Sequence, residues 1–378
     1  MYKITNIKKL VATIAADSIG KLLFLPAGLF RKEKKIDSDQ ICEILIIRTA
    51  FIGDVVMTLP ILKPLKDRFP DSRITFLTAT SASDLLKNNP HIDEIMIYDP
   101  FWFYSKTGGY RSYLQTIRKL RNRRFDLVIE ARGDIRDILL LAYPIKAAVK
   151  IGYDVGGGGY LLTHLVPYEK LKHKVEYHLD IVRFLGCHAD RHGPLVFLDE
   201  TAKTVVKRFL KTHDVTRPFV CVHPGARLFL KRWPAEKCAR LYDLILKELR
   251  MPVVIVSDKG ELSIVRDVME RMKTRPVVFA GSLRELAGIL AESSLFVCND
   301  SAPMHIAAAM KTPIVAIFGP SKSAETAPYG TNGSVVETYL SCRRRCDEHS
   351  CNNRRFHACM AAIKPDEVYH AVTSMLNR

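Results

Sequence analysis

The sequence lacks the complete signatures of the common nucleotide-binding loops. The stretch GYDVGGGGYLL contains four consecutive glycines, Gly156–Gly159, but not the Lys-Ser/Thr ending of a phosphate-binding P-loop. We interpret it as a flexible hairpin or mobile loop. Neither half of the chain carries a glycine-rich dinucleotide fingerprint directly after a strand-like segment. This absence argues against an oxidoreductase built from tandem dinucleotide-binding domains.

Long uninterrupted apolar runs are absent as well. A membrane-spanning helix needs about 20 apolar residues without charges, and Asp17 and Lys21 interrupt the apolar pattern of the N-terminal arm, residues 1–42. The arm shows no clear cleavage site of a secretion signal. Its apolar residues recur at helical spacing between Lys8-Lys9 and the basic run RKEKK. The pattern fits a helix in the headgroup plane of an anionic membrane, which we favour, or a helix packed on its own domain.

Acidic residues are scarce relative to basic ones. The 378 residues include 57 Lys+Arg and 40 Asp+Glu, which gives a formal net charge of +17. This excess predicts anionic partners, and nucleic acid, an anionic membrane surface and a phosphorylated substrate all qualify. Hydrophobic residues make up 48% of the chain, so it folds, and its length suits two domains better than one core.

The paired C-x2-C spacing of common zinc sites is missing. Five of the nine cysteines lie in apolar surroundings, where cysteine behaves as a small hydrophobe. The other four form a C-x3-C-x4-C-x7-C cluster, at Cys342, Cys346, Cys351 and Cys359. Four thiolates suit Zn²⁺, but the spacing and the basic residues between them favour no metal, with zinc as the alternative. Without a convincing secretion signal, the cysteines indicate a reducing compartment.

Strand-like and helix-like segments alternate along most of the chain. EILIIR is followed by the helical pattern DVVMTLPILKPLKDRF, and after a less regular stretch the alternation restarts at PFVCVHPG. Continuous apolar strands in such alternation predict parallel sheets covered on both faces. We therefore predict an α/β protein with two doubly wound, Rossmann-like domains, residues 43–210 and 211–378, that face a shared cleft. Ligands are expected at the carboxyl ends of the strands.

The first strand-to-helix turn carries an acid. RTAFIGDVVMTLP has a single glycine, Gly53, followed by Asp54. Aspartate is a favoured helix N-cap, so capping explains this residue without any function. The functional alternative is a general base at the carboxyl edge of the first sheet. Capping would weaken such a base, because backbone donors stabilise the carboxylate.

The corresponding loop of the second half is basic. HPGARLFLKRWP places Arg227, Lys231 and Arg232 between a strand and a helix that opens at Pro234, a favoured first helical residue. Cations at this position suit a diphosphate. A solvated basic loop is the alternative.

The segment CNDSAPMHIAAAM contains a further candidate site. Asp300 and Ser301 end a strand at the start of a helix, whose free N–H groups and positive dipole end favour an anion. His305 lies one turn into this helix on the side of Ser301, within reach of a phosphate or sugar hydroxyl, although helix histidines are often structural. In SDKGEL, Glu261 is placed to accept hydrogen bonds from ribose hydroxyls.

These segments together resemble glycosyltransferase family 9, the ADP-heptose:lipopolysaccharide heptosyltransferases. The similar segments are ILIIRTAFIGDVVMTLPILKPLKDRFPDSRITFL, HPGARLFLKRWPAEKCARLYDLI and NDSAPMHIAAAMKTPIVAIFGPS, and the likeness includes the late cysteines before CMAAIKPDEVYHAV. It covers about residues 43–376 and leaves out the N-terminal arm. The motifs are specific in combination and not singly.

The resemblance implies a GT-B architecture and metal-independent, inverting transfer of heptose from ADP-heptose to the lipopolysaccharide inner core, with no cofactor required. It assigns the role of general base to Asp54, binding of the diphosphate to Lys231 and binding of the ribose to Glu261. It assigns binding of the sugar and phosphates to Asp300, Ser301 and His305. Secondary candidates are Gly225, Ala226, Arg227 and Ala302 on the donor side, and Gly53 and Arg132 on the acceptor side.

One residue departs from the family pattern. Many members have glycine where this chain has Ala302, whose methyl group narrows the approach of a phosphate to the backbone. The implied partners are a nucleotide sugar, the lipopolysaccharide core or a lipid A precursor, and the inner membrane surface, but no nucleic acid. The implied location is cytoplasmic and peripheral at the inner face of the cytoplasmic membrane. The alternatives are a transferase of this fold with another nucleotide sugar, a nucleotide-dependent oxidoreductase, and a non-catalytic basic membrane-binding protein.

Overall fold

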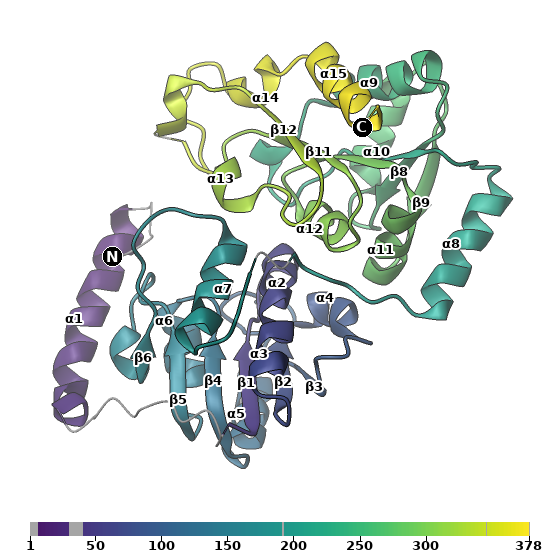
Figure 1. The fold of residues 1–378 in the computed structure, drawn as a ribbon. Helices are drawn as coiled ribbons and strands as arrows, with labels where there is room; N and C mark the ends of the chain where they lie inside the picture. Colours follow the sequence, from purple (N-terminus) through teal and green to yellow (C-terminus); the bar gives the residue numbers. More distant parts are fainter. Residues whose placement is uncertain (1–6, 30–40, 191–192, 345, 378) are drawn as a thin grey trace. The chain divides into compact units, whose positions relative to one another are not determined.

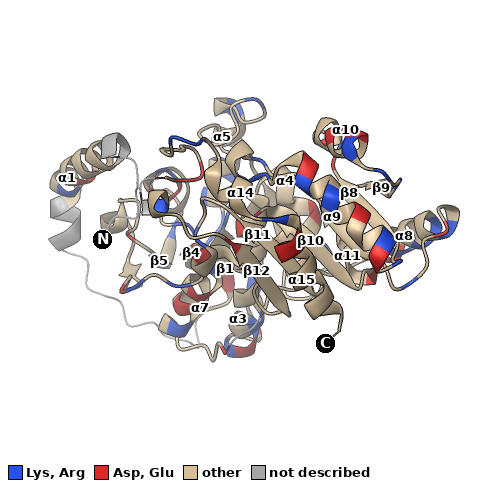
Figure 2. Cartoon of the chain, turned by 90° about the horizontal axis from the view of Figure 1, so that it is seen from above, with Lys and Arg blue, Asp and Glu red and all other residues tan. Residues whose placement is uncertain are grey.

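The chain folds into two compact α/β units. The structure, a computed structural model, describes residues 7–29, 41–190, 193–344 and 346–377. Contacts divide the chain into residues 1–192 and 193–378, and each unit is built on one six-stranded sheet (Figure 1). In both units, Lys, Arg, Asp and Glu lie more on the helices that cover the sheets than on the strands (Figure 2).

The first sheet is wholly parallel and has the order β3-β2-β1-β4-β5-β6. Ile44–Ile47 of the central strand β1 are fully buried, because both faces of the sheet are covered, and Ile46 pairs with Phe76 and Ile129. This arrangement confirms the predicted buried strand. The strands are β1 (Glu43–Ile47), β2 (Arg73–Thr78), β3 (Glu94–Ile97), β4 (Phe125–Glu130), β5 (Ala147–Gly152) and β6 (His164–Leu165).

The helices of the first unit follow the predicted alternation after α1 (Ile7–Leu29). The longer ones are α2 (Ile52–Thr58), α3 (Leu62–Arg68), α5 (Tyr110–Arg121) and α7 (Lys174–Phe184). The short turns are η2 (Leu59–Ile61), α4 (Thr80–Ser83), η3 (Asp84–Leu86), α6 (Ile135–Asp137), η4 (Ile138–Ala142) and η5 (Gly159–Leu161).

The second sheet repeats the strand order of the first, as β12-β11-β10-β7-β8-β9, and is also parallel. Its strands are β7 (Val220–His223), β8 (Val253–Ser257), β9 (Val277–Ala280), β10 (Leu295–Asn299), β11 (Ile314–Phe318) and β12 (Gly333–Glu337). Its helices are α8 (Glu200–Thr212), η6 (Phe229–Lys231), α9 (Ala235–Glu248), α10 (Leu262–Arg271), α11 (Leu283–Glu292), α12 (Ala302–Ala309), α13 (Ser323–Thr326), η7 (Ser341–Arg344), α14 (Ala358–Ala362) and α15 (Pro365–Leu376). The two sheets confirm the prediction of two doubly wound domains.

The boundary between the units differs from the sequence-based one at α8. We expected the first domain to continue to residue 210, whereas the contacts divide the chain after residue 192. The difference arises because α8 packs on α11, where Val206 is buried and an added Cβ on Gly288 would lie 3.0 Å from its side chain. The polar pattern of α8 gave no sign of which sheet it covers.

The four-glycine stretch is not the mobile loop that we expected. Gly157 and Gly158 have φ of +82° and +84°, in the left-handed region that favours glycine, and both are buried. The N–H of Gly158 donates to Asp17 Oδ1 at 2.7 Å, so the stretch holds α1 against the first unit. Packing on its own domain was one of the two readings of the N-terminal arm. The basic run at residues 31–35 lies outside the described residues.

Candidate active site

Each sheet reverses its strand order once, and charged and polar side chains that could bind or react with a ligand lie at both reversals. In the first unit the reversal lies between β1 and β4, and in the second between β7 and β10. In doubly wound sheets, ligands bind outside the carboxyl ends of the strands at this switch point. Asp54 follows β1, Arg132 follows β4, His223 ends β7, and Asp300 follows β10.

Asp54 contributes to the helix start without being its cap. The N-cap of α2 is Phe51, and Asp54, the third helical residue, accepts the Phe51 N–H at 3.3 Å through Oδ2. Its Oδ1 lies 3.0 Å from Arg48 Nη2 and 3.1 Å from Lys174 Nζ. The side chain is 17% exposed, so one edge of the carboxylate can meet a ligand. The structural and functional readings of this residue are therefore compatible in geometry.

The charges around Asp54 keep it ionised. Burial alone would raise the pKa of Asp54, but Lys174, Arg48 and Arg132 outweigh burial and hold this pKa well below its usual range. The carboxylate form, which accepts protons, is thus fully populated at neutral pH. The same charges make it a weak base in the resting protein.

A buried frame fixes the cations around Asp54. Arg48 is 6% exposed, and its Nη1 donates to Ala131 O at 3.0 Å. The His178 ring nitrogens lie 2.9 Å from Met57 O and 3.0 Å from Ala131 O, so this residue joins α7 to α2 and to the end of β4. Burial and the charge of Arg48 lower the pKa of His178 to about 4, so the ring is neutral at pH 7 and donates to one of these two carbonyl oxygens. Lys174 stands one helical turn before His178, on the same side of α7.

Two buried acids lie beside this frame. Glu130 ends β4, is fully buried, and accepts the Gly133 N–H at 2.6 Å. Burial and the neighbouring Asp137 raise the pKa of Glu130 to about 8, and burial raises that of Asp137 to about 6. Trp102 Nε1 donates to Asp137 Oδ1 at 2.9 Å. Glu130 is therefore mostly protonated at neutral pH, whereas Asp54 is ionised and has an exposed edge.

The other acceptor-side candidates lie near Asp54. The Arg132 guanidinium donates to Ala50 O at 3.3 Å and stands 3.9 Å from the centre of the Phe103 ring. Gly53 is the second residue of α2 and is half-buried. The turn that carries Asp54 is thus bordered by a cation and an aromatic face, a combination that suits an anionic sugar.

In the second unit, His223, Glu261 and Ser301 converge. The Nε2 atom of His223 lies 2.8 Å from Glu261 Oε2, and its Nδ1 atom lies 3.4 Å from Ser301 Oγ. A Cβ added to Gly225 would overlap the Glu261 carboxylate, so only glycine allows this approach. Burial would raise the pKa of Glu261, but the hydrogen bond and charge of His223 outweigh it and lower this pKa. Glu261 is held as an acceptor at the edge of the site.

Lys231 lies between two carboxylates. Its Nζ is 2.8 Å from Asp300 Oδ2 and 3.0 Å from Glu348 Oε2. Burial would lower the pKa of Lys231, but the two acids outweigh burial and raise it. Lys231 and Asp300 are 14% and 5% exposed, whereas Glu348 is 39% exposed. The lysine is always charged, and Glu348 is its more accessible partner.

The Asn299 side chain holds the loop that carries these residues. Its Nδ2 donates to Pro224 O at 2.8 Å and to Gly225 O at 3.2 Å, and its Oδ1 accepts the Trp233 N–H at 3.1 Å. Both ends of the loop after β7 are thereby tied to the end of β10. Asn299 itself is 1% exposed.

The remaining donor-side candidates lie on the same two segments. Ala226 is buried, and its carbonyl accepts from Arg232 Nε at 2.8 Å, while Arg227 is exposed. Ala302 is the first residue of α12 and is half-buried, and His305 in the first turn is 6% exposed. The structure thus brings the second-unit candidates to one sheet edge, and it places Asp54, Gly53 and Arg132 at the corresponding edge of the first unit.

Sequence reasoning missed four residues of these sites: Arg48, Lys174, His223 and Glu348. His223 directly follows an apolar strand in the quoted HPG segment, and that position was a usable signal. Lys174 is 120 residues from Asp54. No local pattern connects them.

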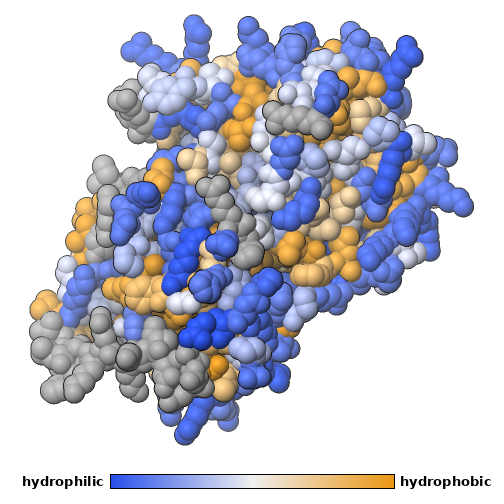
Figure 3. Space-filling view, viewed as in Figure 1, coloured by the Kyte–Doolittle hydropathy of each residue, from blue (hydrophilic) through white to orange (hydrophobic). Residues whose placement is uncertain are grey.

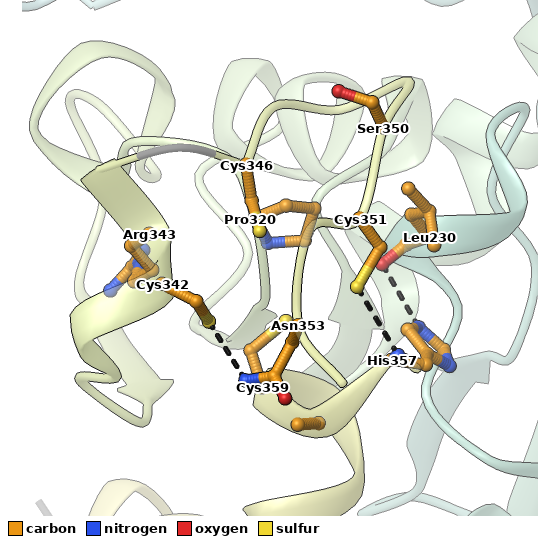
Figure 4. A pocket seen from close by; sticks show the side chains of 11 residues that line it. Leu230, Pro320, Cys342, Arg343, Cys346, Ser350, Cys351, Asn353, His357 and Cys359 are labelled. Carbon is orange, nitrogen blue, oxygen red and sulfur yellow. Dashed lines mark hydrogen bonds between the residues drawn. The ribbon is translucent and has the colours of Figure 1, made fainter. Parts of the chain in front are cut away.

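The four late cysteines line one small cavity (Figure 4). Cys342 Sγ accepts from Asn353 Nδ2 at 3.1 Å, and Cys351 Sγ accepts from the His357 N–H at 3.4 Å. The His357 ring lies 3.0 Å from Leu230 O, so the cysteine loop packs beside Lys231. In the described part of the chain, no group of three or more His, Cys, Asp or Glu side chains is placed to hold a metal ion. The zinc alternative stays a prediction.

Two Rossmann-like units with candidate sites at their switch points form the architecture of the GT-B class. A family 9 glycosyl transferase from Veillonella parvula has the same fold, with a TM-score of 0.75 and 24% identity over 89% of this chain and 97% of that one. The Escherichia coli heptosyltransferase WaaC with ADP matches with a TM-score of 0.68 and 17% identity, over 88% of this chain and 99% of that one.

The sequence comparisons give the family. Residues 113–355, well over half of the chain, match the model of glycosyltransferase family 9 (heptosyltransferase), and the chain belongs to this family. It is 28% identical to lipopolysaccharide heptosyltransferase 3 of E. coli K12, over 74% of this chain and 83% of that protein. It is 24% identical to the lipopolysaccharide core heptosyltransferase OpsX of Haemophilus influenzae, over 78% of this chain and 84% of that protein. The resemblance drawn from the motifs is confirmed.

Proposed function

We propose that this enzyme transfers a heptose from ADP-heptose to the inner core of lipopolysaccharide, with inversion and without a metal, at the cytoplasmic face of the inner membrane. The names of the relatives support the acceptor, since they are heptosyltransferases of lipopolysaccharide. Related structures were solved with ADP and with ADP-2-deoxy-2-fluoro heptose, which supports the donor. The observation that carries the proposal is the ionised, partly exposed Asp54 among three cations at the first switch point.

The acceptor reacts beside Asp54. A sugar hydroxyl attacks the anomeric carbon of the heptose, the new C–O bond forms as the C–O bond to the diphosphate breaks, and the hydroxyl proton moves to Asp54. A positioned carboxylate contributes ~10²–10⁴-fold to such a step. The low pKa of Asp54 does not prevent this transfer, because the hydroxyl becomes strongly acidic as its oxygen bonds to carbon.

Lys174 connects acceptor binding to the strength of this base. Lys174 is 35% exposed, whereas the other close cation, Arg48, is 6% exposed. An anionic group of the acceptor would draw Lys174 away from Asp54 more readily than Arg48. Asp54 would then lose one of the charges that lower its pKa, and it would become a stronger base when the acceptor is bound.

The donor binds at the second switch point. Lys231 exchanges Glu348 for the diphosphate and stabilises the negative charge that develops on the leaving ADP. The free N–H groups at the start of α12, next to Ser301, favour the same phosphates. Glu261, oriented by His223, accepts from the ribose hydroxyls, and Asp300 and His305 contact the sugar. The methyl group of Ala302 limits how closely a phosphate approaches the helix start.

A donor screen tests this function. The full-length enzyme is given core lipopolysaccharide acceptor and a panel of nucleotide sugars, with ADP or UDP release as the readout. Release is expected only with ADP-heptose and acceptor together, in the presence of a chelator, and the anomeric configuration of the product, determined by NMR, should be inverted. Turnover with a different nucleotide sugar alone would overturn the donor assignment, and loss of turnover with the chelator would overturn metal independence.

A further inference from the structure

Helix α1 turns a mixed stripe toward the protein. Leu10, Thr13, Asp17, Gly20 and Phe24 recur at helical spacing and are its more buried residues. Asp17 is fully buried and accepts the Gly158 N–H at 2.7 Å. A Cβ on Gly20 would overlap the Tyr160 ring, so the helix backbone lies directly on this residue. The centre of this contact is thus made by a buried aspartate and a glycine, with apolar residues on either side.

Five apolar residues of α1 point away from the protein. They are exposed by 41–72%: Val11 60%, Ile14 41%, Ile19 59%, Leu22 72% and Leu23 72%. Orange patches mark the left edge in Figure 3, where Figure 1 shows α1, and in Figure 2 the described part of α1 is nearly free of charged colours. Single exposed apolar residues are ordinary, but five on one helix form a contiguous apolar face that marks an interaction site.

This orientation is the reverse of that of an ordinary surface helix. Such a helix packs its apolar stripe on the core and exposes its polar side. Here the Asp17–Gly158 hydrogen bond and the Gly20–Tyr160 contact fix the opposite rotation. Ring contacts of Phe24 with Tyr143, at 5.4 Å, and Tyr160, at 5.9 Å, hold the helix further along. The apolar face is therefore presented outward by specific contacts.

The charge of the chain indicates what covers this face. Lys8 and Lys9 belong to the first turn of α1, the run RKEKK follows the helix in sequence, and the net charge is +17. An anionic lipid surface complements both the apolar face and these cations. In the described residues no helix has the length and apolar composition needed to cross a membrane. The features fit a helix that lies in the lipid interface.

We propose that α1 is a lipid-docking helix, held by the Asp17–Gly158 contact, that binds the first unit to an anionic membrane surface through Val11, Ile19, Leu22 and Leu23. This inference specifies the membrane location in the proposed function and rests on it, but it is independent of the donor and acceptor sugars.

Vesicle flotation of the full-length protein tests the proposal. The wild type should float with phosphatidylglycerol–phosphatidylethanolamine vesicles and much less with neutral phosphatidylcholine vesicles. Burying one leucine side chain is worth about tenfold or more in partition, so Leu22→Ser with Leu23→Ser should weaken binding by on the order of 100-fold. The matched control, Leu114→Ser with Leu195→Ser, changes leucines that are 48% and 44% exposed outside α1 and should bind as the wild type does.

The outcomes separate lipid from a second copy of the chain. Undiminished flotation of the Leu22→Ser, Leu23→Ser variant would overturn the proposal. A second outcome would also overturn it: the wild type forms a dimer in lipid-free sedimentation, this variant does not, and the wild type does not bind vesicles. A second copy of the chain would then cover the face. As a second measurement, brominated lipids should quench the tryptophan fluorescence of Leu22→Trp more than that of the wild type. Equal quenching of the two proteins would count against insertion.

Turnover distinguishes this proposal from the proposed function. With a delipidated core oligosaccharide the Leu22→Ser, Leu23→Ser variant should match the wild type, and with acceptor in vesicles it should be slower by at least tenfold. If no protein turns over either acceptor, the proposed function fails while the flotation result still stands.

Discussion

Replacement of Asp54 by asparagine tests the reaction most directly. The substitution keeps the size of the side chain and an oxygen that can accept the Phe51 N–H, but it removes the negative charge. We expect kcat to fall by ~10²–10⁴-fold, which corresponds to about 3–5 kcal/mol of lost transition-state stabilisation. The affinity for ADP should not change, because the nucleotide is assigned to the second unit. Calorimetry with ADP and single-turnover transfer measure the two effects separately.

The same substitution affects folding, and the structure gives the size of the effect. Arg48, 6% exposed, loses the carboxylate 3.0 Å away. Removing one partner of a buried ion pair typically costs about 3–5 kcal/mol. The hydrogen bond from Arg48 to Ala131 O remains, so we expect a loss of about 3 kcal/mol in the free energy of unfolding, measured in urea. Transfer must therefore be assayed where the variant is fully folded.

Two further variants separate catalysis from folding. Asp134→Asn changes a neighbouring acid of similar exposure, 18%, that pairs with Arg136 and should reduce kcat by less than tenfold. Combining Asp54→Asn with Arg48→Met removes both buried charges and should recover stability without recovering turnover. If Asp54→Asn alone keeps kcat within tenfold of the wild type, or if the double variant restores it, Asp54 is a structural residue and the mechanism is wrong.

Three other predictions follow from the charged groups. Lys231→Met should weaken ADP binding by about 10–100-fold, which is the usual value of a charged hydrogen bond. The control Lys237→Met loses only contacts to backbone carbonyls and should bind ADP as the wild type does. Equal ADP affinities of the two variants would exclude the diphosphate role of Lys231. Glu348→Gln should tighten ADP binding several-fold, because the diphosphate no longer competes with a carboxylate for Lys231, and weaker binding would contradict this exchange. Glu130 has a folded pKa of about 8, above its ordinary 4.5, so the folded state favours its protonated form. The free energy of unfolding should therefore fall as pH rises from 4.5 to about 8, by up to ~1.4 kcal/mol per pH unit. Glu130→Gln should flatten this decline in urea titrations, and an unchanged slope would be evidence against it.

The sheets were predictable because their strands are continuous apolar runs. Ile44–Ile47 and Leu295–Asn299 read as buried strands in the sequence and are buried in the fold. Asp300, directly after β10, and Asp54, in the first turn of the helix that follows β1, were predictable for the same reason, since ligands bind at the carboxyl ends of the strands of each sheet.

The electrostatic partners of these candidates were not predictable. Lys174 reaches Asp54 from a helix 120 residues away, and Glu348 reaches Lys231 from an aperiodic loop. The rotation of α1 was also hidden, because a helical apolar period shows that a helix has an apolar face but not which way that face points. In this chain the Asp17–Gly158 hydrogen bond and the Gly20–Tyr160 contact fix the rotation.

The Asn299 amide has a consequence for how the two units respond to salt. Its three bonds to Pro224, Gly225 and Trp233 use neutral groups, which dissolved ions do not screen. The turn around Asp54 is instead held by Arg48 and Lys174, one of them partly exposed to solvent. Rising ionic strength should therefore weaken the ion pairs of Asp54 and those of Lys231, while the Asn299 bonds keep both ends of the loop after β7 in place.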